Sequence, residues 1–241
     1  MTGADESLVR STFTAQEGRV ERFTVPVAAH LEQGRPARVL DVGCGTGAQL
    51  LHLAKTLPRI EGIGVDISDP SIAAATAAAR RHGLSDRLRF VAKDYLTLAE
   101  GRFDAIISDS VLHNIPVSDD RLYAKLAADL APGGRLFFTI PYDCLFNRLL
   151  WGVRRLLRLF RGHLLDRMVL TVGRLLHPDW PVAMLVERVP YIYMTPYRVD
   201  GAAMRQRMAG QGLQLDQAMT VPHASLGQAR HRFLVYRQRD R

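Results

Sequence analysis

Three glycines follow a short apolar stretch, in the sequence Val39-Leu-Asp-Val-Gly-Cys-Gly-Thr-Gly47. Glycine loses more backbone entropy on folding than any other residue, so this grouping has a cost that a plain connection would avoid. A glycine-rich turn lets a ligand approach the backbone, and a helix beginning at Ala48 offers it free N–H groups. The stretch therefore predicts a ligand site.

Acidic residues end the next two apolar stretches. Asp66 lies about 20 residues after the turn, where a carboxylate can accept hydrogen bonds from both ribose hydroxyls. Asp94 follows the next stretch, where a carboxylate can accept a hydrogen bond from an adenine amino group. These residues predict a nucleoside site. Nicotinamide dinucleotides stay open at this point, because Gly43, Gly45 and Ala48 also satisfy the loose G-x-G-x-x-G/A pattern.

The elements that must position these residues are apolar, β-branched runs alternating with helical patterns. We predict strands at Arg38–Val42, Ile60–Asp66, Leu88–Lys93, Phe103–Ser108 and Arg135–Ile140. We predict helices after Gly47, from about Pro70 to His82, and from about Asp119 to Leu130. This alternation is typical of an α/β, doubly wound, mostly parallel sheet, whose ligands bind outside the carboxyl ends of the strands.

Two further motifs are Phe103-Asp-Ala-Ile-Ile-Ser-Asp109 and Leu130-Ala-Pro-Gly-Gly134. With the glycine turn, Gly64-Val-Asp-Ile67 and Lys93-Asp-Tyr95, they occur in the order and spacing of a family. The sequence resembles the class I S-adenosylmethionine-dependent methyltransferases. The resemblance implies a Rossmann-like fold, S-adenosylmethionine as cofactor, no metal, and methyl transfer as the activity.

The resemblance also implies how the methionine end of the cofactor is held. Asp41 would face the ammonium group, directly or through water, while Gly43, Gly45 and Gly47 leave room for the ligand. From the residues alone, Asp41 could instead cap the turn that follows it.

For the nucleoside end, the resemblance implies that Asp66 holds the ribose and Ile67 packs on adenine. Asp94, beside Tyr95, would bind the adenine amino group, although a solvated loop carboxylate is the alternative for Asp94. Ser108, at the end of the fourth predicted strand, is counted with these cofactor contacts.

Catalytic residues are hard to see because the sulfonium activates its own leaving group, so that transfer depends mainly on alignment. A phenol or enol acceptor needs a base, and His113, just past the fourth strand, is the candidate. A pocket wall or a structural histidine is the alternative, and Tyr142 is a weaker candidate. After the fourth strand the chain reads Ser108-Asp-Ser-Val111, which disfavours the branches that methylate DNA bases or protein glutamine.

The charge of the chain is divided unevenly. The 241 residues carry a formal net charge of +8, yet residues 141–241 contain 16 arginines against 7 acidic residues, a net charge of +9. This asymmetry marks a boundary near residue 140. We divide the chain into an N-terminal helical segment (1–34), a cofactor domain (35–142 and 198–241) and an insertion (143–197) that forms a lid over the acceptor.

The insertion contains a basic amphipathic helical hairpin. On a helical wheel of Cys144–Arg161 the apolar side chains cover roughly half the circumference, and arginines without any acidic residue share the other half. Leu164–Leu176 repeats the pattern more weakly. Three roles stay open: a lid whose arginines face water, attachment to anionic lipid, and contact with nucleic acid.

These observations favour methyl transfer to a small hydrophobic or amphiphilic acceptor, such as a quinone precursor, a lipid or a polyketide-like phenol. The alternatives are an RNA methyltransferase and a cofactor-binding regulatory protein without methyl transfer. The two cysteines form no metal-ligand pattern, and no apolar run reaches the roughly 20 residues of a membrane span. We expect a cytoplasmic protein, with peripheral membrane contact as an open question and no nucleic-acid partner.

Overall fold

The structure is a computed structural model that describes residues 17–31, 35–176, 189–222 and 228–239, with residues 178, 182, 185 and 186 between them. The predicted N-terminal segment is thus described only over α2 (Glu17–Leu31). The insertion is described in part, because several of its residues after 176 lie outside the described residues.

The described strands form one seven-stranded sheet in the order β3-β2-β1-β4-β5-β7-β6. They are β1 (Ala37–Val42), β2 (Ile60–Asp66), β3 (Leu88–Ala92), β4 (Phe103–Asp109), β5 (Leu130–Pro141), β6 (Leu213–Thr220) and β7 (His231–Gln238). Pairing is parallel from β3 to β5, and β7 is antiparallel to both of its neighbours. The predicted doubly wound, mostly parallel α/β sheet is confirmed.

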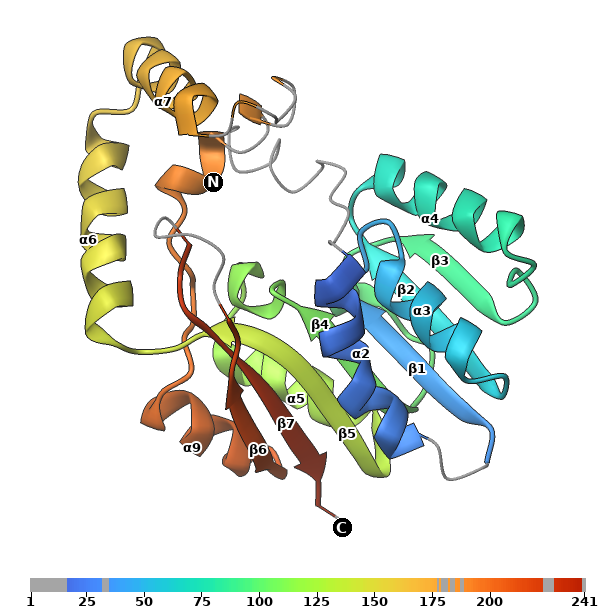
Figure 1. The fold of residues 1–241 in the computed structure, drawn as a ribbon. Coiled ribbons are helices and arrows are strands. Elements are labelled where there is room, and N and C mark those ends of the chain that lie inside the picture. Colours follow the sequence, from blue (N-terminus) through green and yellow to red (C-terminus); the bar gives the residue numbers. More distant parts are fainter. Residues whose placement is uncertain are drawn as a thin grey trace.

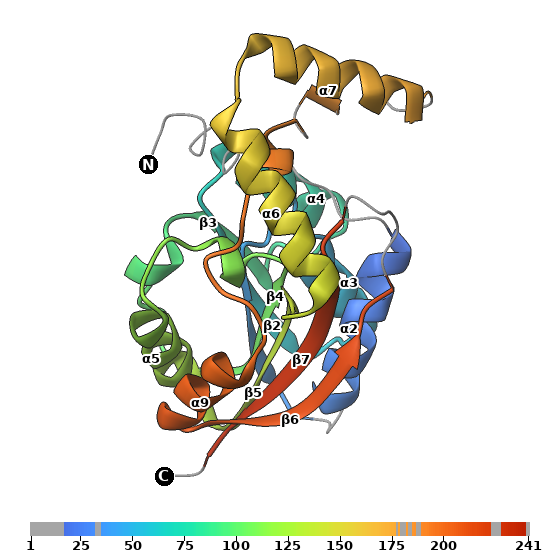
Figure 2. The same ribbon diagram turned by 90° about the vertical axis from the view of Figure 1, so that its left-hand side faces the viewer.

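Helices cover both faces of the sheet (Figure 2). One face carries α2, α3 (Ala48–Thr56) and α4 (Asp69–Arg81), and the other carries α5 (Asp119–Asp129) and α9 (Ala202–Gly210). Alternate residues of a strand point to opposite faces of the sheet, so each strand contributes side chains to both hydrophobic cores. Val39 and Ile107 are buried beneath α2 and α3, whereas Leu40 and Ile106 belong to the core on the side of α5.

The strand order places a crevice at the carboxyl ends of β1 and β4. β1 pairs with β2 on one side and with β4 on the other. The order of the strands along the sheet therefore reverses between β1 and β4. Ligands of doubly wound sheets bind in such a crevice. Short 3-10 helices follow β3 and β4 at this edge: η1 (Tyr95–Thr97) and η2 (Leu112–Asn114).

Two helices of the insertion, α6 (Leu145–Leu159) and α7 (His163–Leu176), lie beyond the carboxyl edge of the sheet (Figure 1). α6 rises from the end of β5 and contacts η3 (Val189–Tyr193). Its first turn is anchored by buried Asn147, whose side chain donates to the Tyr142 and Arg230 carbonyls at 2.7 and 2.9 Å. Among the described helices, none is both long and apolar enough to cross a bilayer.

Candidate functional site

The glycine turn between β1 and α3 needs glycine for its backbone conformation. Gly43, Gly45 and Gly47 have φ angles of 73°, 51° and 79°, in the left-handed region that other residues rarely adopt. The Gly43 and Cys44 amides donate to the Val65 carbonyl at 2.8 and 3.1 Å, which ties the turn to the end of β2. The turn is therefore a fixed part of the crevice.

The protein's own side chains fill the space beside two of these glycines. A Cβ atom on Gly43 would lie 2.4 Å from Val111 Cγ2, and one on Gly47 would lie 2.7 Å from Phe90 Cε1. At these positions glycine permits close packing by the loop after β4 and by β3. Any room for a ligand must come from the remainder of the turn.

Asp66 is held against the turn by backbone donors. Its Oδ2 accepts a hydrogen bond from the Gly45 amide and its Oδ1 from the Ser68 amide, both at 2.9 Å. Each carboxylate oxygen has two lone pairs, so Asp66 can still accept two hydroxyl groups. The carboxylate is thus fixed in position and retains acceptor capacity.

Asp41 is buried at the end of β1, and its Oδ2 has no hydrogen-bond partner among the described residues. Burial, followed by the nearby charges of Asp109 and Asp66, raises the pKa of Asp41 well above its usual value. An unpaired buried carboxyl group is costly, and a cation beside it would remove that cost. The group fits the ammonium of the cofactor that the resemblance implies.

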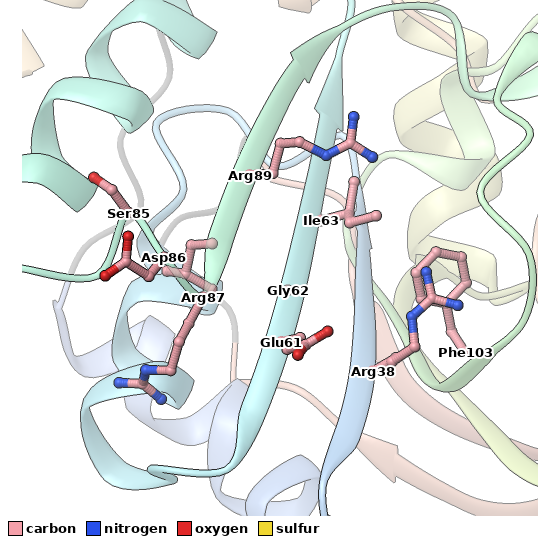
Figure 3. A pocket seen from close by; sticks show the side chains of 10 residues that line it. Arg38, Glu61, Gly62, Ile63, Ser85, Asp86, Arg87, Arg89 and Phe103 are labelled. Carbon is pink, nitrogen blue, oxygen red and sulfur yellow. The ribbon is translucent and has the colours of Figure 1, made fainter.

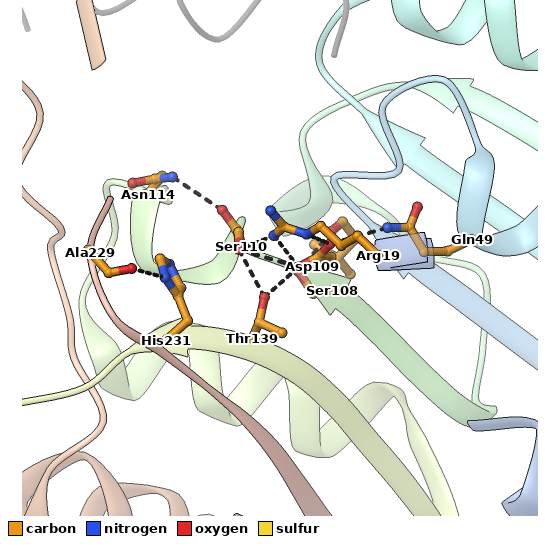
Figure 4. Close-up of polar contacts among 10 residues, drawn as sticks. Arg19, Gln49, Ser108, Asp109, Ser110, Asn114, Thr139, Ala229 and His231 are labelled. Atoms are coloured by element: carbon orange, nitrogen blue, oxygen red, sulfur yellow. Dashed lines mark hydrogen bonds and ion pairs between the residues drawn. The ribbon is translucent and has the colours of Figure 1, made fainter. Parts of the chain in front are cut away.

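A polar network surrounds Asp109 at the end of β4 (Figure 4). Arg19 of α2 donates to both carboxylate oxygens, from Nε and Nη2, at 2.7 Å each. Thr139 donates to Oδ1 at 2.5 Å, and Ser110, the non-glycine residue with a φ of 62°, accepts from Arg19 at 2.8 Å. This bidentate ion pair joins the first turn of α2 to the end of β4.

Ser108 ties β4 to β1 within the crevice. Its hydroxyl is fully buried and donates to the Val42 carbonyl at 2.8 Å. That bond uses the hydroxyl proton, so the side chain joins the two strand ends and has no proton left for a ligand.

The residues predicted for adenine differ in their placement. Ile67 is 45% exposed beside Asp66. Asp94 is exposed at the start of η1, where its Oδ1 accepts from the Leu96 amide at 2.9 Å. The Tyr95 ring is instead buried in the core on the side of α5, with Lys125 Nζ 4.9 Å from its centroid. The side chains of Ile67 and Asp94 are therefore accessible to an adenine ring, and the side chain of Tyr95 is not.

His113 lies in η2 and is buried, with its Nδ1 unpaired among the described residues. Its ring meets that of His231, on β7, with centroids 5.6 Å apart. Burial lowers the pKa of His113 well below its usual value, and His231, Arg198 and Arg19 lower it further. His113 is therefore a neutral imidazole near pH 7.

Sequence reasoning missed two residues here: His231, whose ring meets that of His113, and Arg198, which holds the loop of His113. His231 Nδ1 lies 2.8 Å from the Ala229 carbonyl. Because a carbonyl can only accept, Nδ1 carries the proton and Nε2 is the acceptor in the neutral ring. Arg198, also buried, bonds the carbonyls of Leu112, Ile115 and Val117, and thereby fixes the loop that carries His113. Tyr142, the weaker candidate, packs beneath Arg232, whose guanidinium carbon lies 4.3 Å from the ring centroid.

A separate groove of about 290 Å³ lies at the opposite, amino ends of β1, β2 and β3 (Figure 3). Its arginines already have partners. Arg38 donates to the Arg102 and Glu100 carbonyls, Arg87 to the Ala54 carbonyl, and Arg89 forms an ion pair with Glu100. This groove therefore offers an anion no unpaired guanidinium, and the crevice remains the candidate site.

Part of the chain is similar to known methyltransferases. Residues 39–134 match the family model of a methyltransferase domain. The trans-aconitate 2-methyltransferase of Streptomyces avermitilis is 36% identical over 118 residues, which are 48% of this chain and 44% of that protein. The release factor glutamine methyltransferase of Agrobacterium fabrum is 41% identical over 73 residues, 30% of this chain and 25% of that protein. The chain thus spans less than half the length of these relatives.

A solved structure shares the whole fold. The magnesium protoporphyrin IX methyltransferase of Synechocystis, crystallised with SAH, superposes with a TM-score of 0.60 over 97% of this chain and 92% of that chain. At 17% identity this similarity shows the common fold alone.

Proposed function

We propose that the chain is a class I S-adenosylmethionine-dependent methyltransferase, because residues 39–134 match a methyltransferase domain, and that it methylates a small hydrophobic or amphiphilic acceptor. The observation that carries the cofactor assignment is the unpaired, buried carboxyl group of Asp41 beside Asp66 and Asp109. A buried carboxyl group without a partner suits a ligand that brings an ammonium group to it.

In this proposal, residues of the turn and of the strand ends each bind a different group of the cofactor. Asp41 binds the ammonium group, Asp66 the ribose hydroxyls, and Asp94 the adenine amino group, with Ile67 against the base. Gly43, Gly45 and Gly47 shape the turn. Ser108 and Tyr95 do not contact the cofactor in this proposal. The Ser108 hydroxyl donates to a backbone carbonyl, and the Tyr95 ring is packed in the core. When bound, the cofactor supplies a methyl group activated by its sulfonium.

His113 is the proposed base for an acceptor hydroxyl. A neutral imidazole can take a proton, but a lowered pKa makes it a weak base. Such a base suits an acceptor whose hydroxyl is itself acidic, such as a phenol or an enol, better than an aliphatic alcohol. His231 and Arg198 would act as positioning residues for this ring.

The acceptor class rests on the insertion. α6 follows directly on the end of β5, and the half-buried apolar residues Phe146, Leu150 and Leu157 lie on its less exposed side. One relative is named for a small acid, trans-aconitate, and another is named for a protein, a release factor. The match to the release factor enzyme spans only 30% of this chain, so it carries little weight for the acceptor.

The test is methyl transfer from methyl-labelled S-adenosylmethionine to a panel of phenols, quinols and lipids, with bulk tRNA in parallel. The proposal expects label in an organic-soluble product, and loss of that label in Asp66→Ala. Label in tRNA alone would establish the RNA alternative. Cofactor binding without transfer to any member of the panel would favour the regulatory alternative.

A further inference from the structure

The apolar stripe of α6 faces solvent instead of the protein core. Its side chains recur every three or four residues and are between 54% and 72% exposed: Leu145, Leu149, Val153, Leu156 and Phe160. This spacing places them on one face of the helix. The less exposed side carries Asn147, Trp151 and Arg154 together with the apolar residues Phe146, Leu150 and Leu157. Arg154 Nη1 donates to the Met194 carbonyl at 3.1 Å.

α7 presents a second stripe of the same kind. Leu164, Met168, Val172 and Leu175 are between 53% and 77% exposed. Three of them, with Arg167 and Thr171, line a shallow groove of about 340 Å³ along the helix. Large exposed apolar patches are rare on soluble monomers and mark interaction surfaces. Among the described residues, the apolar stripes of α6 and α7 therefore do not cover the core.

Unpaired positive charge borders both stripes. Arg155 and Arg158 on α6, and Arg167 and Arg174 on α7, are exposed and form no ion pair with the described residues. The one acidic residue of the two helices, Asp166, accepts a hydrogen bond from the Tyr193 hydroxyl at 2.6 Å. The surface therefore combines apolar side chains with net positive charge.

We propose that α6 and α7 form a docking surface for an anionic phospholipid membrane. Apolar side chains would enter the boundary between head groups and acyl chains, and the four arginines would pair with lipid phosphates. Charge complementarity selects this occupant. A second copy of the same surface would bring unpaired arginines against arginines, and a nucleic acid would leave the apolar stripes uncovered. The inference concerns attachment only, and it holds whether or not the methyl acceptor is a lipid.

Vesicle co-sedimentation tests it, with phosphatidylcholine vesicles and with vesicles containing one third phosphatidylglycerol. The full chain should bind the anionic vesicles at low salt, bind the neutral ones at least tenfold more weakly, and dissociate at high salt, because screening shortens the attraction. The variant R155Q/R158Q/R167Q/R174Q should bind the anionic vesicles at least tenfold more weakly, and L149S/V153S/M168S should also lose binding. Both sets of side chains are exposed, so the fold should persist.

The matched control is R22Q/R80Q/R81Q/R102Q, which removes the same charge from exposed positions outside α6 and α7 and should bind like the wild type. Titration with S-adenosylmethionine, expected to be equal in all four proteins, separates failure of attachment from failure of the proposed function. The inference is wrong if the wild type ignores anionic vesicles, if the control loses binding equally, or if the wild type forms a dimer that L149S/V153S/M168S dissociates.

Discussion

The rings of His113 and His231 meet edge to face, with centroids 5.6 Å apart, although one lies in η2 and the other on β7. Neither ring forms an ion pair among the described residues, and burial is the leading cause that lowers both pKa values. The pair therefore places two neutral imidazoles beside the Arg19–Asp109 ion pair, at the edge of the proposed methyl-transfer site.

This pair predicts an acid-sensitive fold. The unfolded chain binds a proton on histidine near pH 6.5, whereas folded His113 does so only at lower pH. Its contribution to stability is thus complete above pH 6.5 and is lost as pH falls through the lowered pKa. His113→Gln should flatten the fall in unfolding free energy between pH 6.5 and about 5, measured by urea titration. An unchanged slope, equal to that of the exposed-site control His163→Gln, would contradict the placement of His113.

The glycine turn predicts a difference between two substitutions. Gly43→Ala must adopt a φ of 73° and also place a Cβ 2.4 Å from Val111, whereas Gly83→Ala meets only the backbone cost, at a φ of 66° with nothing within 4 Å. We expect a loss of about 1–2 kcal/mol at Gly83 and a further loss of about 1–3 kcal/mol at Gly43. Adding Val111→Ala should recover part of the Gly43 loss. Equal losses in thermal unfolding would exclude the contact.

Asp66 predicts a change in affinity. Asp66→Ala removes a charged acceptor of two hydroxyl groups, so binding of S-adenosylmethionine should weaken by about 1.5–3 kcal/mol, or roughly 10–150-fold in Kd. Asp216→Ala, which removes a carboxylate at the far edge strand β6, is the control and should leave Kd unchanged. If Asp66→Ala bound S-adenosylmethionine with wild-type affinity, the assignment of the ribose to Asp66 would be wrong.

Arg19 predicts a cost in stability that depends on its partner. Arg19→Met leaves the carboxylate of Asp109, which is only 7% exposed, without its bidentate donor. We expect a loss of up to about 3 kcal/mol of unfolding free energy, less than for a fully buried pair because Arg19 itself is 31% exposed. The double variant R19M/D109N should be more stable than Arg19→Met alone. Additive losses in a double-mutant cycle would show that the two side chains do not interact.

Local patterns predicted the elements that build the crevice. The β-branched runs and the glycine turn located the parallel strands. The helix predicted from about Pro70 to His82 is α4, and Ser68 caps it by accepting from the Ser71 amide at 3.3 Å. The Leu130-Ala-Pro-Gly-Gly134 motif precedes the strand predicted at Arg135–Ile140, and the structure includes the motif within β5.

The contacts that local patterns missed are long-range. Arg19 reaches Asp109 from a helix whose sequence gives no sign of its partner, and His231 reaches His113 through the pairing of β5 with β7. The amphipathic pattern of α6 located its apolar stripe correctly but could not indicate whether the stripe faces core or solvent, since that depends on where the neighbouring elements pack.

The most direct test of the account is calorimetric titration of S-adenosylmethionine in buffers of different ionisation enthalpy. In the free protein the pKa of Asp41 is raised, so its carboxyl group keeps its proton at pH values where an ordinary aspartate has lost it. An ammonium group beside Asp41 favours the charged carboxylate. Binding should therefore release a proton, and affinity should rise with pH until the pH exceeds that raised pKa. We predict proton release by the wild type, and weaker binding without that release by Asp41→Asn. Binding of NADH in place of S-adenosylmethionine, or identical affinity and proton release in Asp41→Asn, would contradict the assignment.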